Sequence, residues 1–346
     1  MSELRHNPIS RRWVIIAAER ARRPLDFIHV PGHEPPPADN CPFCPGHEAD
    51  TPPEIHAHRA NGAQPNGPGW SLRVVPNKYP ALMIEGEPGR RGVGLYDRMR
   101  GIGAHEVIIE TPDHDMSLGR MKTEQIEQVL IAYQERLRDL MRDPRFKYVL
   151  IFRNHGALAG ASLAHPHSQL IATPVTPREV AVELDSSKIH HHQKERCLLC
   201  DLIAQEIEAG DRIVSIGESH VAYAPYASRF PFEILFAPRV HGHSFAETPR
   251  HEIAAIAAGL KDTLRRLESV LRDPPYNFVL HTAPNVNTMT RRSNYWDTLP
   301  FDFHWHFEIL PRISRVAGFE WGTGFYINPT SPEEAAAFLR DAELEP

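Results

Sequence analysis

The sequence predicts an α+β fold in which one unit occurs twice, each copy an antiparallel sheet with a helix packed on it. In both halves of the 346 residues, short apolar runs rich in valine, isoleucine and phenylalanine flank one long amphipathic segment. Several landmarks recur in the same order: a Cys-x-x-Cys pair, a strand followed by a histidine, a helix ending in Arg-Asp-Pro, a further strand and a His-x-His. A tandem duplication explains this order better than coincidence.

The first half begins with a strand over residues 11–17, which leads to a Cys-x-x-Cys knuckle over residues 41–44. Apolar residues recur at helical spacing over residues 123–141. Asp143-Pro144 ends that helix, because the residue before a proline avoids helical backbone angles. Further strands are expected over residues 72–75, 105–110 and 148–152, and from the His165-Pro166-His167 run onward.

The second half repeats this order. Its helix starts at Thr248-Pro249, an N-cap followed by proline, and ends at Arg272-Asp273-Pro274. A capping box beginning at Ser331 starts a terminal helix. The knuckle is expected over residues 197–200 and the strands over residues 232–241, 278–280 and 304–310. We therefore divide the chain into an N-terminal half, residues 1–180, and a C-terminal half, residues 181–346.

The composition excludes several classes of protein. Apolar residues make up 41% of the chain and charged residues 24%, which is typical of soluble globular proteins. The net charge of −6 gives no overall positive field for nucleic acid or an anionic membrane, so any phosphate binding must be local. We find neither an apolar stretch as long as a membrane span nor the apolar run of a signal peptide, and we expect a cytoplasmic protein.

The four cysteines form two Cys-x-x-Cys pairs, and the duplication places two histidines in register with each pair. Two thiolates and two imidazoles make a complete tetrahedral zinc set without a position for water, so one or two structural zinc ions are expected. Buried free cysteines are the alternative, and a thiol redox role is weaker because neither pair is expected to open a helix after a strand. The expected ligands are Cys41, Cys44, His114 and His165 in the first half, and Cys197, Cys200, His241 and His304 in the second.

The His165-Pro166-His167 run carries the chemistry that we predict. Alternate side chains of a strand share a face, so His167 lies beside the metal ligand His165 and is free to react. A neutral imidazole is a good nucleophile towards phosphorus and leaves well as imidazolium, so His167 can take a nucleotidyl group from a nucleoside diphosphate. Gln169 projects from the same face and can donate to a phosphate oxygen.

A loop over residues 156–160 leads to this run, and its backbone amides together with Ser162 can bind an anion. The corresponding segment of the second half, residues 297–302, is not rich in glycine. The second His-x-His is also followed by Glu308, without a glutamine. One active histidine, His167, is therefore expected.

The segment His165-Pro166-His167-Ser168-Gln169, with Cys-Pro-x-Cys near the start and Pro112-Asp113-His114 between them, resembles galactose-1-phosphate uridylyltransferase, a branch of the histidine triad superfamily. The likeness covers nearly the whole chain, from Trp13-Val14 to Gly322-Thr323-Gly324. It implies two histidine-triad-like units in one subunit, the N-terminal one catalytic, and usually a homodimer. It also implies a ping-pong reaction in which UDP-glucose gives UMP to His167 and releases glucose 1-phosphate. Galactose 1-phosphate then takes the UMP to give UDP-galactose.

The same resemblance implies substrate-binding roles. Arg20 and Arg23 would lie near the nucleotide phosphates, and Asn77 would contact the nucleoside. The residues that would line the phosphates are Asn154, Gly160, Ser162 and Gln169. Phe319 and Glu320 would contact the hexose. The segment before Phe319 lacks the Lys-Phe of the best-known enzymes. This departure leaves the sugar acceptor open.

The second metal site departs from the best-known enzymes, which use a glutamate and three histidines. Here Glu183, His281, His304 and His306 fit that pattern. The chain also has the Cys197 pair, as in the plant ADP-glucose phosphorylase branch, whose sites are both zinc. We favour the thiolates, because two soft ligands hold zinc more firmly.

Three alternatives to the uridylyltransferase follow. A nucleotide-sugar phosphorylase, in which inorganic phosphate takes AMP or UMP from His167, shares the first half-reaction. Hydrolysis is less favoured, because Gln169 stands where the hydrolases of the superfamily have a third histidine. A zinc-ribbon nucleic-acid module is disfavoured by the scattered ligands and the negative charge, so the expected partners are a nucleotide sugar and a hexose 1-phosphate.

Overall fold

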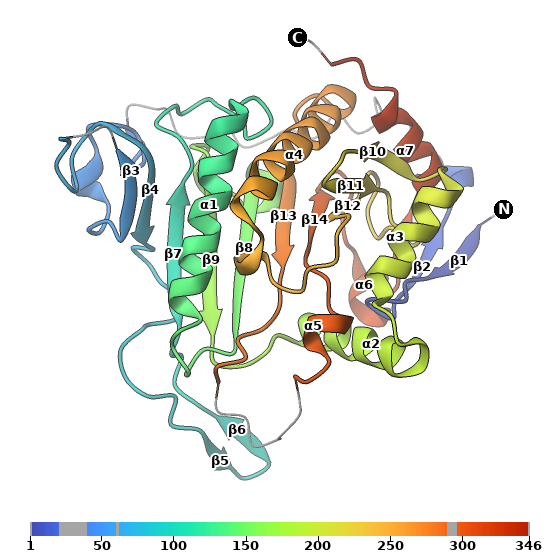
Figure 1. Cartoon of the computed structure of the whole chain (residues 1–346), viewed down its shortest axis with the longest axis horizontal. Helices are drawn as coiled ribbons and strands as arrows, with labels where there is room; N and C mark the ends of the chain where they lie inside the picture. Colours follow the sequence, from blue (N-terminus) through green and yellow to red (C-terminus); the bar gives the residue numbers. More distant parts are fainter. Residues whose placement is uncertain (1, 21–39, 60–61, 289–295, 345–346) are drawn as a thin grey trace.

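A computed structural model describes residues 2–20, 40–59, 62–288 and 296–344, and its largest element is a ten-stranded sheet (Figure 1). All neighbouring strands of this sheet are antiparallel. In spatial order the strands are β10 (Ile213–Ile216), β11 (His220–Tyr223), β12 (Ile234–Pro238), β14 (His306–Pro311), β13 (Tyr276–His281), β8 (Tyr148–His155), β9 (His167–Thr173), β7 (Ala104–Ile109), β4 (Trp70–Pro76) and β3 (His56–Arg59).

This strand order is symmetric about the central pair of β8 and β13. Counted outward from that pair, β9 corresponds to β14, β7 to β12, β4 to β11 and β3 to β10. The predicted α+β duplication is therefore confirmed, with the two copies sharing one continuous sheet. The division at residues 180 and 181 falls inside α2 (Arg178–Lys194) and stays a prediction.

Two long helices, α1 (Thr123–Leu140) and α4 (Arg250–Leu271), pack side by side on one face of the sheet (Figure 1). Each buries an apolar stripe, with Ile126, Val129 and Tyr133 in α1 and Ile253, Leu260 and Leu264 in α4, and together they form the main core with the sheet. The helix predicted over residues 123–141 is confirmed to within one residue at its end.

Smaller elements complete the chain. The second half opens with α2 and α3 (Leu198–Ala209), and the short α5 (Leu299–Asp302) lies between β13 and β14. A separate sheet contains β1 (Glu3–His6), β2 (Trp13–Ile16) and β15 (Tyr326–Asn328), flanked by η1 (Ala18–Arg20), α6 (Gly318–Thr323) and α7 (Pro332–Arg340). The hairpin of β5 (Arg91–Val93) and β6 (Tyr96–Arg98) projects from the molecule (Figure 1). The remaining short turns are η4 (Glu48–Asp50), η5 (Ala157–Ala159) and η6 (Phe245–Glu247).

Two local predictions are wrong. Cys197 is the N-cap of α3, so residues 197–200 open a helix and do not form a separate knuckle. Pro249, predicted as the first helical residue, is the N-cap of α4. By contrast the cap at Ser331 is confirmed, because its hydroxyl accepts the Glu334 backbone N–H at 3.2 Å. Among the described residues, none of the helices combines the length and apolar content that crossing a bilayer requires.

Candidate active site and metal centres

His167 is the first residue of β9, directly after Pro166. Leu170 belongs to the core beneath α1, so the alternation of the strand points His167 and Gln169 to the opposite face. The ring of Phe43, from the Cys-Pro-Phe-Cys segment, packs edge-on against His167 with 5.3 Å between ring centroids. His167 is only 6% exposed as a result of this packing and its place in the sheet.

The hydrogen bonding of His167 determines which ring nitrogen can react. Its Nδ1 lies 2.8 Å from the backbone carbonyl of His165. A carbonyl oxygen only accepts, so Nδ1 carries the proton and the lone pair of Nε2 is left for attack. Burial lowers the pKa of His167, although the hydrogen bond to the His165 carbonyl opposes this shift. The imidazole is therefore neutral near pH 7, which is the nucleophilic form.

A buried polar network lies on the helix side of β9, beneath His167. Ser168 donates to Glu110 Oε1, and the Tyr133 hydroxyl contacts the same serine oxygen. Arg153 Nε lies 3.0 Å from Glu110 Oε2, and these two side chains are 2% and 0% exposed. Sequence reasoning missed this network, because only the register of β7, β8 and β9 brings its members together. The local signal was a charged residue inside the buried strand β8 and another directly after the buried strand β7.

Gln169 is held by His105 of the neighbouring strand β7. His105 Nδ1 accepts the Ala81 backbone N–H at 3.2 Å, so Nε2 carries the proton and donates to Gln169 Oε1 at 2.8 Å. This bond engages the carbonyl end of the Gln169 amide and leaves its donor end for another partner. Asn77 Nδ2 lies 3.1 Å from His105 Nε2. The predicted residues Asn77 and Gln169 therefore meet at a histidine that sequence reasoning did not single out.

Asn154 lies beside His167, because the preceding residue of β8 pairs with Ser168 of β9. Its Oδ1 accepts from Asn277 of β13 at 2.8 Å, while its Nδ2 faces the loop before β9, 3.7 Å from where a Cβ on Gly160 would lie. Gly160 has a φ of +89°, a conformation that favours glycine. Ser162 is exposed two residues further on. The structure thus places these loop residues at the approach to β9.

The other predicted substrate residues lie on other elements or outside the described residues. Arg20 ends η1, and Arg23 lies outside the described residues. Phe319 and Glu320 lie on α6, which Figure 1 places on the opposite side of the central strands from β7 and β9. Phe319 is 44% exposed, and Glu320 accepts the Ala317 backbone N–H at 2.9 Å. Their implied contacts with a hexose stay a prediction.

The first predicted metal set comes together in space. The ligand atoms of Cys41, Cys44, His114 and His165 all lie within 4.8 Å of one another. Cys44 Sγ is 3.4 Å from His114 Nδ1 and 3.5 Å from His165 Nδ1, close to the roughly 3.5 Å between sulfur and nitrogen ligands of tetrahedral zinc. His165 Nε2 donates to the Thr111 carbonyl at 2.7 Å, which leaves Nδ1 unprotonated for a metal. The donor set therefore fits a zinc ion.

The second predicted set has the same geometry. The ligand atoms of Cys197, Cys200, His241 and His304 also lie within 4.8 Å of one another. Cys200 Sγ is 3.4 Å from His241 Nδ1 and 3.3 Å from His304 Nδ1. His241 Nε2 donates to the Pro300 carbonyl at 2.9 Å, so its Nδ1 is again unprotonated. The thiolate set favoured from the sequence is complete without Glu183, His281 or His306.

These three remaining residues form a separate cluster. His306 Nδ1 faces the His304 carbonyl at 3.1 Å, and its Nε2 lies 3.4 Å from Glu183 Oε1. His281 Nδ1 lies 2.8 Å from Glu183 Oε2, and its ring stacks on His306 with 4.9 Å between centroids. Burial would lower the pKa of His281, but Glu183 and Glu308 outweigh it and raise the pKa to about 10. The cluster thus holds an imidazolium between carboxylates.

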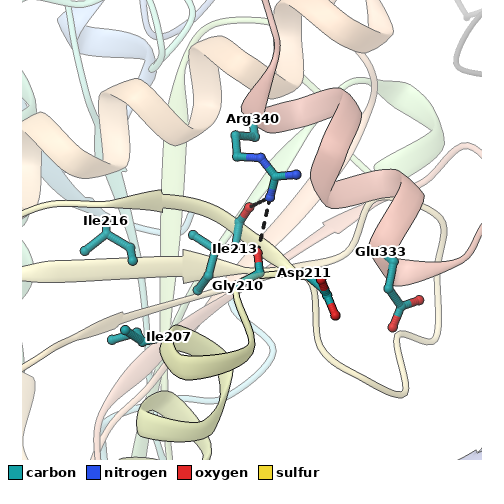
Figure 2. A pocket seen from close by; sticks show the side chains of 7 residues that line it. All are labelled: Ile207, Gly210, Asp211, Ile213, Ile216, Glu333 and Arg340. Carbon is teal, nitrogen blue, oxygen red and sulfur yellow. Dashed lines mark hydrogen bonds between the residues drawn. The ribbon is translucent and has the colours of Figure 1, made fainter.

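A surface pocket lies beside β10, at the edge of the second half (Figure 2). Arg340 points across it but is held by the carbonyls of Gly210 and Ile213 at 3.3 and 2.9 Å. Glu333 at its rim pairs with Arg5 and Arg212. Arg340 and Glu333 are therefore already paired, and His167 is not among the residues that line the pocket.

Two joined units of this fold, with His167 buried beside a Cys₂His₂ set, match the arrangement that the resemblance to a nucleotidyltransferase of the histidine triad type implied. The comparisons with known proteins make this specific. Residues 1–177 match the N-terminal domain of galactose-1-phosphate uridyl transferase, and residues 183–338 match its C-terminal domain. The chain belongs to the galactose-1-phosphate uridyl transferase family.

Several members are similar over the whole length. ADP-glucose phosphorylase from Arabidopsis thaliana is 36% identical over 99% of this chain and 93% of its own. Galactose-1-phosphate uridylyltransferase from Thermotoga maritima is 31% identical over 100% of both chains. The crystal structure of the Arabidopsis ADP-glucose phosphorylase with bound ADP-glucose superposes with a TM-score of 0.82, at 35% identity over 100% of both chains. A solved uridylyltransferase gives a TM-score of 0.73 at 29% identity, covering 98% of this chain and 97% of its own.

Proposed function

We propose that the chain transfers a nucleoside monophosphate from a nucleotide sugar to a phosphate-bearing acceptor through a covalent intermediate on His167. The observation that carries this proposal is the hydrogen bond from Nδ1 to the His165 carbonyl, which directs the Nε2 lone pair to the substrate face. Nε2 attacks the α-phosphorus, the bond from that phosphorus to the bridging oxygen breaks, and the sugar 1-phosphate leaves with the electron pair. An acceptor phosphate oxygen then attacks the α-phosphorus, the phosphorus–nitrogen bond breaks, and the neutral imidazole is regenerated.

The neighbouring donors suit the charge that develops on phosphorus. Gln169 bonds His105 through its carbonyl, so the donor end of its amide has no partner among the described residues. The Asn154 amide faces the loop beside His167, and the Gly160 and Ser162 backbone lies on the same approach. Preorganised donors of this kind are the main protein contribution to phosphoryl transfer. We assign the phosphates to this group together with Arg20 and Arg23, and the nucleoside to Asn77.

The reaction that we assign is uridylyl transfer from UDP-glucose to galactose 1-phosphate, the reaction for which the family is named. Phosphorolysis of ADP-glucose is the second candidate. This second reaction is supported by sequence similarity, because the Arabidopsis phosphorylase is 36% identical to this chain and the Thermotoga uridylyltransferase is 31% identical. Both reactions pass through the same nucleotidyl-histidine, so the acceptor and the base distinguish them.

The experiment incubates zinc-replete protein, without acceptor, with UDP-glucose or ADP-glucose labelled in the α-phosphate. Acid-labile label on the protein is followed, and each acceptor is then added separately. Label from UDP-glucose that galactose 1-phosphate discharges supports the uridylyltransferase. Label from ADP-glucose that inorganic phosphate discharges supports the phosphorylase. Absence of label from both donors contradicts the covalent mechanism.

We propose that both Cys₂His₂ sets hold zinc and that the ions are structural, since four protein ligands leave no position for substrate. The first ion would fix the Cys41 segment, and with it Phe43, against His167. Cys44→Ser and Cys200→Ser test this by elemental analysis. Each variant should lose one zinc ion of two from these sets, and an unchanged zinc content would contradict the assignment.

We infer that two copies of the chain associate in the cytoplasm as a homodimer. The β5–β6 hairpin projects from the body of the molecule and carries exposed apolar side chains, with Val93, Leu95 and Tyr96 at 50%, 103% and 79% exposure (Figure 1). Such a cluster is characteristic of an interface. Leu95→Glu with Tyr96→Lys should give a monomer in analytical ultracentrifugation. A wild-type chain that sediments as a monomer at micromolar concentration would contradict the dimer.

A further inference from the structure

A further group of metal-ligating side chains lies away from the Cys₂His₂ sets and from the Glu183 cluster, at the outer edge of the large sheet. His56 and His58 are alternate residues of the edge strand β3, opposite Val74 and Leu72 of β4. Val74 and Leu72 belong to the core beneath α1, so both imidazoles lie on the helix-covered face. Glu135 of α1 meets them there, and the ligand atoms of the three residues lie within 4.8 Å of one another.

The free atoms of this cluster converge. Nε2 of His56 and Nε2 of His58 are both shielded from solvent, and within the described part of the chain neither has a hydrogen-bond partner. Glu135 Oε2 lies 3.5 Å from His56 Nε2. The other carboxylate oxygen, Oε1, is 3.3 Å from the guanidinium of Arg250, which orients the carboxylate towards the histidines. Two imidazole nitrogens and one carboxylate oxygen thus lie within 4.8 Å of one another.

An ion pair between His56 and Glu135 explains only part of this arrangement. It leaves His58 Nε2 buried without a hydrogen-bond partner among the described residues, which is costly for a polar atom. Burial is the main cause that lowers the pKa of His58, and the neighbouring His56 lowers it further. The His58 ring is therefore neutral and keeps a lone pair near pH 7. A cation between the three residues satisfies both nitrogens and the carboxylate together. The Arg250 side chain is 63% exposed, so water screens its repulsion of such a cation.

We propose that His56, His58 and Glu135 form a third divalent-metal site, independent of the Cys₂His₂ sets and of His167. Two imidazoles and a carboxylate suit borderline ions such as Zn²⁺, with water completing the coordination. The site joins an edge strand to the helix that covers it. Edge strands expose unpaired backbone groups, and a metal link of this kind would hold β3 in the sheet.

The test measures zinc on the full-length protein after its two thiolate sets are filled. Wild type, His58→Gln and Glu135→Gln are dialysed against Zn²⁺, and bound zinc is determined by elemental analysis and by calorimetric titration. His251→Gln is the matched control, because that histidine is 82% exposed on α4. We expect wild type and the control to bind one more zinc ion per chain than the two variants, or to bind it at least about tenfold more tightly.

Cobalt distinguishes the sites spectroscopically. Co²⁺ in the first two sets gives thiolate charge-transfer absorption, whereas a third equivalent bound by two histidines and a glutamate should add ligand-field bands alone. Filling of both thiolate sets in His58→Gln shows that the variant is folded. Equal zinc stoichiometry and affinity in wild type and His58→Gln would overturn the proposal, as would a third cobalt equivalent with new thiolate charge transfer.

Discussion

The two halves of the sheet place different side chains at equivalent positions around their His-x-His residues. Because His167 and His306 are each the first residue of the strands β9 and β14, Gln169 corresponds to Glu308. The paired strands β8 and β13 place Asn154 in the position of His281. The first half thus surrounds its histidine with neutral amides, and the second surrounds it with a histidine and a carboxylate.

The difference extends to the opposite side of the sheet. Ser168 corresponds to Phe307, and Arg153 corresponds to Leu280. The polar network of the first half is therefore replaced by apolar core in the second, while both keep a Cys₂His₂ set. The Nδ1 of both histidines faces the carbonyl two residues earlier, but Nε2 of His306 lies against Glu183. The duplicated framework fixes the ring orientation, and the surrounding residues decide whether the second nitrogen is free to react.

The largest expected effect separates the two histidines directly. His167→Gln should abolish nucleotidyl labelling of the protein and lower turnover by more than about 10³-fold, because the nucleophile is lost. His306→Gln is the matched control and should retain labelling, since Glu183 blocks its Nε2. Single-turnover labelling of both variants measures this. Loss of labelling in His306→Gln, with normal zinc content and unfolding, would break the comparison.

The next effect concerns the buried pair of Glu110 and Arg153. Glu110→Gln removes the counter-charge of a nearly fully buried guanidinium and should lower the free energy of unfolding by about 3 kcal/mol. Glu179→Gln is the control, because its pair with Arg12 is exposed and should contribute less than about 1 kcal/mol. Urea unfolding of both variants makes the comparison. A change below about 1 kcal/mol in Glu110→Gln would contradict the importance of the pair.

These contrasts show what the sequence can predict and what it cannot. The helix α1 and the ligands Cys44 and Cys200 are recognisable because their signals are short spacings within one segment. The Glu110–Arg153 pair is formed only when β7, β8 and β9 align, and a single sequence does not encode that register locally. The helix α2 was missed because apolar and polar residues are spread around it, without the stripe that identifies α1.

The structure at the second Cys-x-x-Cys was predicted wrongly for a related reason. Residues 197–200 were expected to form a knuckle, but they open the helix α3. His190 lies near the end of α2, where it pairs with Asp201 of α3 at 2.8 Å. Contacts between α2 and α3 therefore stabilise both helices and place Cys197 at a helix N-cap. Tertiary packing supplied what the local pattern did not indicate.

A pH dependence should distinguish the halves next, because His281 titrates and its counterpart Asn154 does not. The pKa of His281 is about 10 in the folded protein and about 6.5 in the unfolded chain. Between pH 6.5 and pH 10 the folded state therefore binds more protons than the unfolded state. The stabilisation is complete below pH 6.5 and is lost as the pH rises towards 10. From pH 7 to 9 the wild type should lose about 2 kcal/mol more than His281→Asn in urea unfolding. Equal pH slopes would contradict this prediction.

The smallest expected effect tests why Gln169 is available in the first half. His105 holds the Gln169 carbonyl at 2.8 Å, so His105→Ala should lower kcat by about tenfold through loss of orientation, with little change in KM. If His105 acts through Gln169, the double variant with Gln169→Ala should be no slower than Gln169→Ala alone, because the shared interaction is already lost. Additive losses in kcat would instead mean that His105 contacts the substrate itself. In that case the free amide of Gln169 would not account for the difference between the halves.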